Sequence, residues 1–346
     1  MTSEQEAEIE QLAYNAGRNY PYIKNWIGPN EPELSFKTLR NNHPEEFAKI
    51  LVAVFKGLKR GNPDATVFPI GGACNMSVSG GIRGTDHILR ACRKIAPDLN
   101  FDGTVIHPYR SFPEMPDTDR DTVAFLAMLR ENGYGDNHPV YWNEGAYFYP
   151  LSVPQWMGVA PWAETSIKDR YSSMLLPSYD LGWAERVSSA MLLRHWLVAA
   201  KYGDRLQCAT TWMPLLIDNR NPFARVAMQT AFLRILGDAT FKKDIRFLPG
   251  ARAYVFEDGE KRPVAAVWFF TERMDRGKEK AKTLALSLAG LEPDFIDMMG
   301  NTCRVVHEGT TWFPPLSNYP FFIRVKAGQT DLLCEALDAA TIKTQF

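Results

Sequence analysis

The sequence predicts two successive architectures, a parallel α/β part and then an all-β part. Up to about residue 237, short apolar runs alternate with segments of helical periodicity, which is typical of βα units and a parallel sheet. From 246 to 326 the helical periodicity is absent, and short strand-like runs are separated by turn-rich pieces. We therefore expect an α/β domain at 1–237 and an antiparallel β-sandwich with a short tail at 238–346.

Six segments of the α/β part have the spacing of helices. In residues 44–60, Phe47, Leu51 and Leu58 recur on one face, and a Gly-Asn-Pro sequence follows the last basic residues. A proline and two glutamates at the start, with Lys-Arg at the end, suit the helix dipole. The other predicted helices span 4–18, 84–95, 119–132, 183–202 and 223–236.

Strand candidates lie between these helices, and a long excursion at 145–181 follows the fourth of them. The five candidates are Tyr22–Gly28, Thr66–Ile70, Phe101–His107, Pro139–Asn143 and Leu206–Trp212. In the all-β part the strand-like runs are ARAYVFE, PVAAVWFF, TLALSL, DFIDMMG, CRVVHEG and FFIRVK, and residues 238–242 are the predicted domain junction.

Composition excludes several classes of protein. With 45% hydrophobic and 23% charged residues, the chain is neither disordered nor fibrous. Lys plus Arg number 39 against 40 for Asp plus Glu, and no basic stripe occurs, so we expect no nucleic-acid partner. No run of 18 apolar residues exists, so we expect no membrane span. The polar opening is the wrong composition for a secretory signal, and the sequence leaves the localisation open.

The cysteines do not indicate a metal site or a disulfide framework. They are odd in number and contain no C-x-x-C pair. We therefore predict neither a metal nor a cofactor. The five positions are Cys74, Cys92, Cys208, Cys303 and Cys334.

Two glutamates carry the strongest functional signal, because each follows a predicted parallel strand. Glu31 comes after the first candidate and Glu144 after the fourth. Groups at the carboxyl ends of parallel strands converge on one face. Two facing carboxylates are the equipment of glycoside hydrolysis, in which one donates a proton and the other attacks or activates water. A single glutamate after a strand is more often a solvated loop residue, so the local sequences decide.

Those local sequences resemble the retaining glycoside hydrolases of clan A. Asn30-Glu31-Pro32 matches the Asn-Glu-Pro at the end of the fourth strand of their TIM barrel, and Trp142-Asn143-Glu144-Gly145 matches the glutamate of the seventh. Ile106-His107-Pro108-Tyr109 fits the sixth strand, and Thr211-Trp212-Met213 fits the eighth. The resemblance covers residues 5–237. It implies an incomplete (β/α)8 TIM barrel, strands 4–8, followed by the β-sandwich.

The resemblance also implies roles. Glu31 is the expected general acid/base, and Glu144 is the nucleophile that forms a glycosyl-enzyme. Asn30 is expected to bond the 2-hydroxyl of the sugar, and Tyr109 to donate a hydrogen bond to Glu144. A retaining mechanism requires carboxyl groups about 5–5.5 Å apart.

Further aromatic and histidine side chains are candidates for substrate binding. Trp212 offers a flat ring for a pyranose. His107 either contacts the sugar or is a strand-end histidine bonded to backbone. Trp142 adjoins the nucleophile, and the excursion after it is aromatic-rich, so part of that loop is expected to line subsites and part to pack. The loop aromatics are Tyr147, Phe148, Trp156 and Trp162, whereas Trp183, Trp196 and Trp268 are predicted core residues.

The sequence departs from the resemblance at its start. Only 21 residues precede the strand that leads to Asn-Glu-Pro, so three βα units of the barrel have no counterpart. The chain is then a fragment, a subunit completed by a second chain or an upstream segment, or a decayed relative, and we favour the first two. The leading function is a retaining β-glycosidase acting on a poly- or oligosaccharide. A non-catalytic carbohydrate-binding scaffold and a transglycosylase are the alternatives.

Overall fold

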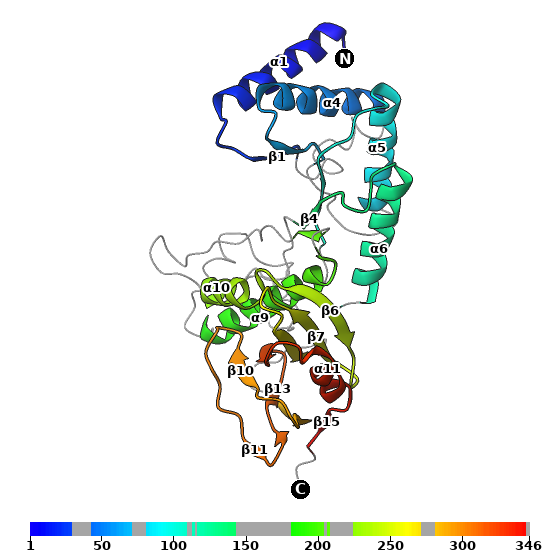
Figure 1. The fold of residues 1–346 in the computed structure, drawn as a ribbon. Helices are drawn as coiled ribbons and strands as arrows, with labels where there is room; N and C mark the ends of the chain where they lie inside the picture. Colours follow the sequence, from blue (N-terminus) through cyan, green and yellow to red (C-terminus); the bar gives the residue numbers. More distant parts are fainter. Residues whose placement is uncertain are drawn as a thin grey trace. The chain divides into compact units, whose positions relative to one another are not determined.

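In a computed structural model, two compact units are found (Figure 1). The parallel unit comprises Met1–Arg110, Met115–Gly145 and Asp204–Trp212, and the β-rich unit comprises the rest. The last two helices before residue 237 therefore belong to the same compact unit as the sandwich. The domain boundary predicted at 237/238 stays a prediction. The structure describes residues 1–29, 43–70, 81–108, 113–114, 116–142, 181–203, 206–207, 224–270 and 281–343.

Four described helices belong to the parallel unit, and each begins and ends within a few residues of its predicted range. They are α1 (Ser3–Asn19), α4 (Pro44–Gly61), α5 (Arg83–Ile95) and α6 (Pro116–Glu131).

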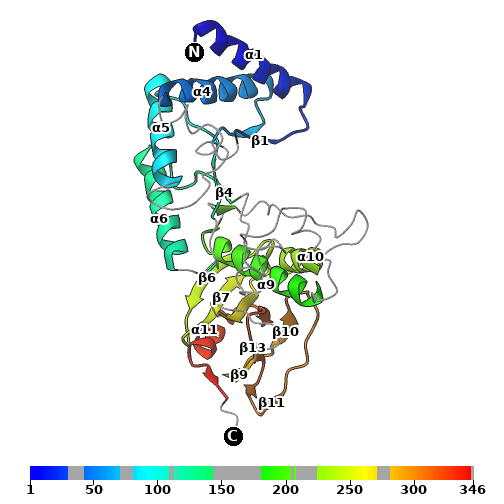
Figure 2. The same cartoon turned by 180° about the vertical axis from the view of Figure 1, so that it is seen from behind.

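Helices α1 and α4 lie side by side (Figures 1 and 2). Their close approach depends on glycine, because a Cβ on Gly57 would lie 2.2 Å from the Glu10 carbonyl oxygen. A Cβ on Gly61 would likewise lie 2.3 Å from the Tyr14 carbonyl oxygen. A side chain at either position would force the two helices apart.

The strands of the parallel unit form two small sheets. In one, β1 pairs in parallel with β2, and in the other β4 pairs in parallel with both β3 and β5. Each strand falls inside a predicted range. They are β1 (Asn25–Ile27), β2 (Thr66–Phe68), β3 (Thr104–Ile106), β4 (Val140–Trp142) and β5 (Leu206–Gln207).

Phe68 links the two sheets. Its ring is fully buried, and its centroid lies 4.4 Å from that of Tyr141 on β4. A Cβ on Gly103, just before β3, would lie 2.0 Å from the Phe68 ring, so only glycine fits there. The carboxylate of Asp102 accepts a hydrogen bond from the Val67 amide at 2.9 Å. The β1–β2 pair therefore packs directly against the β3–β4–β5 sheet.

In its described part, the β-rich unit contains two antiparallel sheets and three helices. Its helices are α9 (Leu181–Ala200), α10 (Ala224–Leu236) and α11 (Thr330–Asp338). One sheet has the order β10–β14–β8–β7–β6, formed by Asp294–Asp297, Phe321–Arg324, Pro263–Phe269, Ala251–Glu257 and Thr240–Ile245. The other has the order β11–β12–β9–β13 with β15 on β9, formed by His307–Glu308, Thr311–Trp312, Lys282–Ser287, Pro315–Leu316 and Thr341–Ile342.

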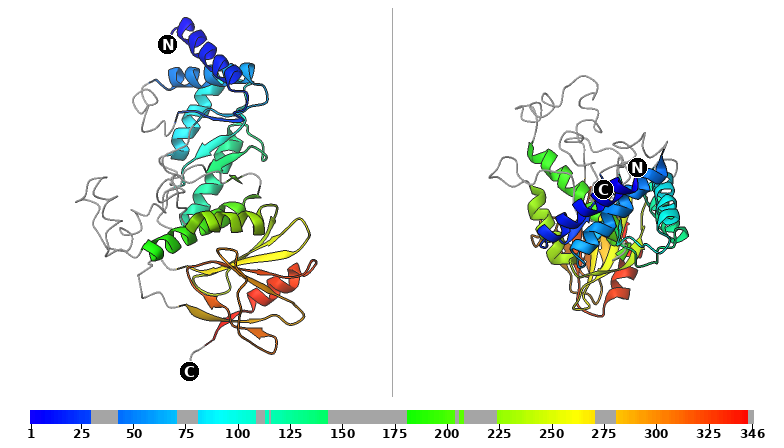
Figure 3. Two further views of the ribbon diagram at one scale, coloured as in Figure 1. Left: turned by 90° about the vertical axis from the view of Figure 1, so that its left-hand side faces the viewer. Right: turned by 90° about the horizontal axis from the view of Figure 1, so that it is seen from above.

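The two sheets share one apolar core with α11, which lies against the strands (Figure 3). Val267 and Ile323 from the first sheet, Leu284 from the second and Leu337 from α11 are all 0% exposed. The predicted antiparallel all-β module is confirmed. Trp196 and Trp268 are buried, as predicted.

Several local predictions for this unit are wrong. Strand β6, which the sequence analysis does not predict, begins at Thr240 within the segment 238–242 and pairs with β7. Its sequence, TFKKDI, hides the strand because charged residues interrupt the alternation. In CRVVHEG only His307–Glu308 is a strand. The tail forms the short helix that its sequence suggests, α11, and β15 follows it where a frayed end is expected. Among the described helices, none is long and apolar enough to cross a bilayer.

Candidate functional site

The carboxyl ends of β1 and β2 are tightly joined. The amide of Gly28 donates to the Phe68 carbonyl at 2.8 Å, which continues the ladder past β1. A Cβ on Gly28 would lie 2.0 Å from the Pro69 carbonyl oxygen. The backbone that leads to Asn30 and Glu31 is therefore anchored at the end of β2, and those two residues lie outside the described part of the chain.

The carboxyl ends of β3 and β4 carry two predicted site residues. Ile106 and Trp142 are partners in the parallel register, and His107 follows directly. His107 and Trp142 are both 0% exposed, so the structure brings them together as buried residues at one edge of the sheet. The remaining predicted site residues and the loop aromatics lie outside the described residues. The site residues are Tyr109, Glu144 and Trp212, and the loop aromatics are Tyr147, Phe148, Trp156 and Trp162.

Three titratable side chains of the parallel unit are shifted by burial. Burial raises the pKa of Tyr141 on β4, whose ring packs on Phe68. Burial also raises the pKa of Tyr134 to about 12 and that of the Cys92 thiol to about 12. These groups stay neutral at physiological pH.

A buried ion pair in the β-rich unit was missed by the sequence reasoning. Arg194 on α9 donates from Nε and Nη2 to the two carboxylate oxygens of Glu114 at 2.6 and 2.7 Å. Trp268 on β8 donates from Nε1 to the same carboxylate at 2.8 Å. The Arg194 and Glu114 side chains are 0% exposed. An arginine inside the apolar run MLLRHWLVAA was the one signal available, and it does not reveal a partner 80 positions away.

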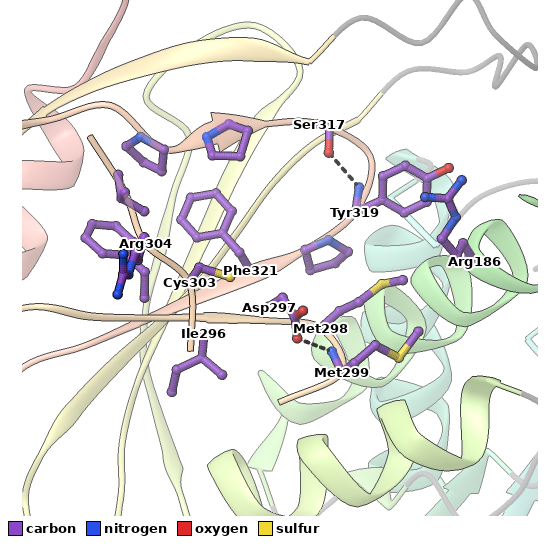
Figure 4. A pocket seen from close by; sticks show the side chains of 15 residues that line it. Arg186, Ile296, Asp297, Met298, Met299, Cys303, Arg304, Ser317, Tyr319 and Phe321 are labelled. Carbon is purple, nitrogen blue, oxygen red and sulfur yellow. Dashed lines mark hydrogen bonds between the residues drawn. The ribbon is translucent and has the colours of Figure 1, made fainter. Parts of the chain in front are cut away.

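A cavity of about 430 Å³ opens in the β-rich unit between α9 and the ends of β10 and β14 (Figure 4). Its walls are mainly apolar, and Arg186 stands over the ring of Tyr319 at 6.0 Å. Asp297, its acidic lining residue, accepts from the Met299 and Asn301 amides and so holds a turn. The cavity can receive an apolar group. In the described parts of the chain, no cluster of His, Cys, Asp or Glu could hold a metal ion.

Comparison with known proteins identifies the fold. No family model matches the sequence, and no curated protein matches it. The structure is similar to a family 39 glycoside hydrolase from Bacteroides cellulosilyticus, with a TM-score of 0.63 and 17% identity over 94% of this chain. It is also similar to a glucosidase from Croceicoccus marinus (TM-score 0.55, 11% identity, 93% of this chain) and a Paenibacillus polymyxa xyloglucanase of family 44 (0.51, 10%, 92%).

These likenesses show a glycoside-hydrolase-like fold. The chain spans 63% of the length of the family 39 enzyme, 74% of the glucosidase and 70% of the xyloglucanase. At this level of identity they show the fold alone.

Proposed function

We propose that this protein is a retaining β-glycoside hydrolase that cleaves a poly- or oligosaccharide. The observation that carries the proposal is the glycoside-hydrolase-like fold, in which two glutamates follow the carboxyl ends of parallel strands. Glu31 lies four positions after the end of β1, and Glu144 lies two positions after the end of β4. The carboxyl ends of parallel strands are where such folds place their chemistry.

The mechanism divides between the two carboxyl groups. Ionised Glu144 attacks the anomeric carbon while protonated Glu31 gives its proton to the leaving glycosidic oxygen, so the C–O bond breaks and a glycosyl-enzyme forms. Glu31, now ionised, takes a proton from water, which attacks the same carbon and releases Glu144. This requires a higher pKa for Glu31 than for Glu144.

The other site residues have positioning and binding roles in this proposal. Asn30 bonds the 2-hydroxyl, Tyr109 orients Glu144, and Trp212 stacks on a sugar ring. His107 and Trp142 are fully buried, which favours supporting the strand that leads to the nucleophile over broad contact with sugar. Substrate contact by either is a prediction that sugar-binding assays of their alanine variants test.

The proposal includes a barrel that further strands complete, because the chain spans only 63% of the length of the family 39 enzyme. We propose that an upstream segment or a second chain supplies the missing strands. If the completed protein stays inactive and Glu144→Gln binds sugar as the parent does, the second candidate, a carbohydrate-binding scaffold, replaces the enzyme.

Hydrolysis of a panel of aryl β-glycosides tests the proposal, with the chain alone and with its upstream segment restored. Glu31→Gln and Glu144→Gln should each lower kcat/KM by at least about a hundredfold. Glu45→Gln is the matched control, because this side chain on α4 is 63% exposed and should leave the rate unchanged. Equal activity of the parent and both site variants would overturn the assignment.

A further inference from the structure

The cavity of about 430 Å³ beside α9 has the size and the lining of a small-molecule site (Figure 4). Ligand pockets usually measure roughly 300–1,000 Å³ and combine apolar walls with a few placed polar groups. Phe295 of β10 and Phe321 of β14 form part of the wall, at 3% and 9% exposed, and their ring centroids lie 6.4 Å apart. Further apolar surface comes from Met298, Val305, Pro314 and Pro320. The interior of the cavity therefore favours an apolar, ring-shaped group.

The wall at the end of β10 is fixed by the protein itself. Asp297 pairs with Phe321 across the β10–β14 ladder, and the turn that follows carries Met298. Oδ1 of Asp297 accepts from the amides of Met299 and Asn301 at 2.8 and 2.9 Å, and Oδ2 accepts from Nδ2 of Asn301 at 3.0 Å. The carboxylate thus holds the turn, and within the described residues it makes no ion pair. Because the cavity is preformed, little conformational freedom is lost when a ligand binds.

Two basic side chains of this cavity have no anionic partner. Arg186 of α9 and Arg304 line it, and Figure 4 shows them on opposite sides with Phe321 between them. Among the residues that the structure describes, neither guanidinium makes an ion pair or a hydrogen bond, and both residues are exposed. Asp297 is the one acidic residue of the lining, and its oxygens serve the turn. The cavity is therefore apolar inside and positively charged at its rim.

Arg186 is the better placed of the two arginines for binding an anion. Its guanidinium lies over the ring of Tyr319, 6.0 Å from the ring centroid. Tyr319 is itself held, because its amide donates to the Ser317 hydroxyl at 3.2 Å. Arg304 has no aromatic partner of this kind in the described part of the chain. An arginine oriented by a ring loses less side-chain freedom on binding, and its planar fork can bond both oxygens of a carboxylate.

We propose that this cavity binds an aromatic carboxylate, with the ring against Phe321 and Met298 and the carboxylate on the guanidinium of Arg186. An aromatic ring matches the phenyl and thioether groups of the wall. A sugar does not, because its hydroxyl groups would lose water without gaining partners on an apolar wall. The proposal concerns residues of the β-rich unit alone and does not depend on the proposed hydrolase.

Isothermal titration calorimetry of the 346-residue chain with 3-phenylpropionate tests this site, with 3-phenylpropionamide and acetate as comparison compounds. We expect 3-phenylpropionate to saturate a single site. The amide should bind at least about tenfold more weakly, because it lacks the charge that the guanidinium recognises. Acetate should show no saturation, because it lacks the ring that fills the apolar interior.

Three arginine variants locate the carboxylate. Arg186→Met should weaken the binding of 3-phenylpropionate at least about tenfold and leave that of the amide unchanged, because it removes the charge and keeps an apolar side chain. Arg304→Met, at the other side of the cavity, should change the affinity by less than about twofold, since an exposed charge at a distance is screened. Arg246→Met is the matched control, because Arg246 is 57% exposed in the same unit and does not line the cavity.

Four results would overturn the inference. They are no saturable binding of 3-phenylpropionate, equal affinity for the acid and the amide, a loss in Arg304→Met that Arg186→Met does not show, and a loss in Glu144→Gln, which would place the compound at the hydrolase site. Binding that Glu144→Gln retains and Arg186→Met loses would support the cavity as the site.

Discussion

The two units close their apolar surfaces to different extents. In the β-rich unit, Val267, Ile323 and Leu284 from facing sheets are 0% exposed. In the parallel unit, Leu12 and Ile27 beside β1 remain 62% and 45% exposed. An antiparallel sandwich covers its inner faces with strands close in sequence, whereas a parallel sheet needs further βα units beside its edge. The core between the two sheets of the β-rich unit is therefore closed, whereas apolar side chains beside β1 stay accessible.

Breaking the buried ion pair of Arg194 and Glu114 should give the largest change in the free energy of unfolding. Arg194→Met leaves the Glu114 carboxylate buried without its bidentate partner, which should lower the free energy of unfolding of the β-rich unit by about 3–5 kcal/mol. Urea unfolding followed by tryptophan fluorescence measures this. Arg324→Met is the control, because Arg324 pairs with Asp294 at the surface and should cost about 1 kcal/mol or less. Similar losses in both variants would contradict a closed β-rich interior.

Truncating one isoleucine in each unit compares a fully buried strand position with a half-exposed one. Ile323→Ala in β14 empties a fully buried position and should cost about 2–5 kcal/mol. Ile27→Ala in β1 removes a half-exposed side chain and should cost less than about 1 kcal/mol in the 346-residue chain. Differential scanning calorimetry of both variants checks the order. A larger loss at Ile27 than at Ile323 would contradict this contrast.

Acid should weaken the β-rich unit through His195. Burial lowers the pKa of this α9 histidine to about 3, against about 6.5 when unfolded. The unfolded chain therefore binds a proton that the folded chain does not, and stability falls as the pH drops below 6.5. At pH 5 the loss should reach about 2 kcal/mol. Urea unfolding at pH 7 and pH 5 measures it, and His195→Asn should flatten that dependence while His87→Asn, exposed on α5, should not.

Thiol labelling gives the smallest and most local readout. Cys92 in the parallel unit and Cys334 in the β-rich unit are both buried, at 4% and 6% exposed, and burial raises the pKa of each thiol. Neither should react in the native protein. With rising urea, site-resolved mass spectrometry should find Cys92 labelled at a lower concentration than Cys334. The reverse order would show that the parallel unit is more stable than the β-rich unit.

Regular local patterns could be predicted from the sequence, and long-range pairings could not. The apolar stripe of 44–60 and the run ARAYVFE gave α4 and β7 almost to the residue, because period and end signals are local. Strand β6 was missed because Lys242, Lys243 and Asp244 break its alternation. The partnership of Arg194 with Glu114 depends on the folded path of the chain.

In the candidate site, too, local motifs could be predicted from the sequence and the burial of side chains could not. The Asn-Glu-Pro and Trp-Asn-Glu-Gly sequences identify residues, and the structure shows parallel strands leading to both. The burial of His107 and Trp142 could not be foreseen, because an apolar strand end looks the same whether a cleft or a core lies beyond it.

Trapping the covalent intermediate tests the proposed hydrolase most directly. The protein with its upstream segment restored is incubated with a panel of activated 2-deoxy-2-fluoro β-glycosides, and its peptides are mapped by mass spectrometry. Retaining catalysis predicts one fluoroglycosyl adduct, on the peptide that contains Glu144, with loss of hydrolysis in step with labelling. Glycoside hydrolysis with no adduct, or an adduct on another carboxylate, would contradict Glu144 as the nucleophile.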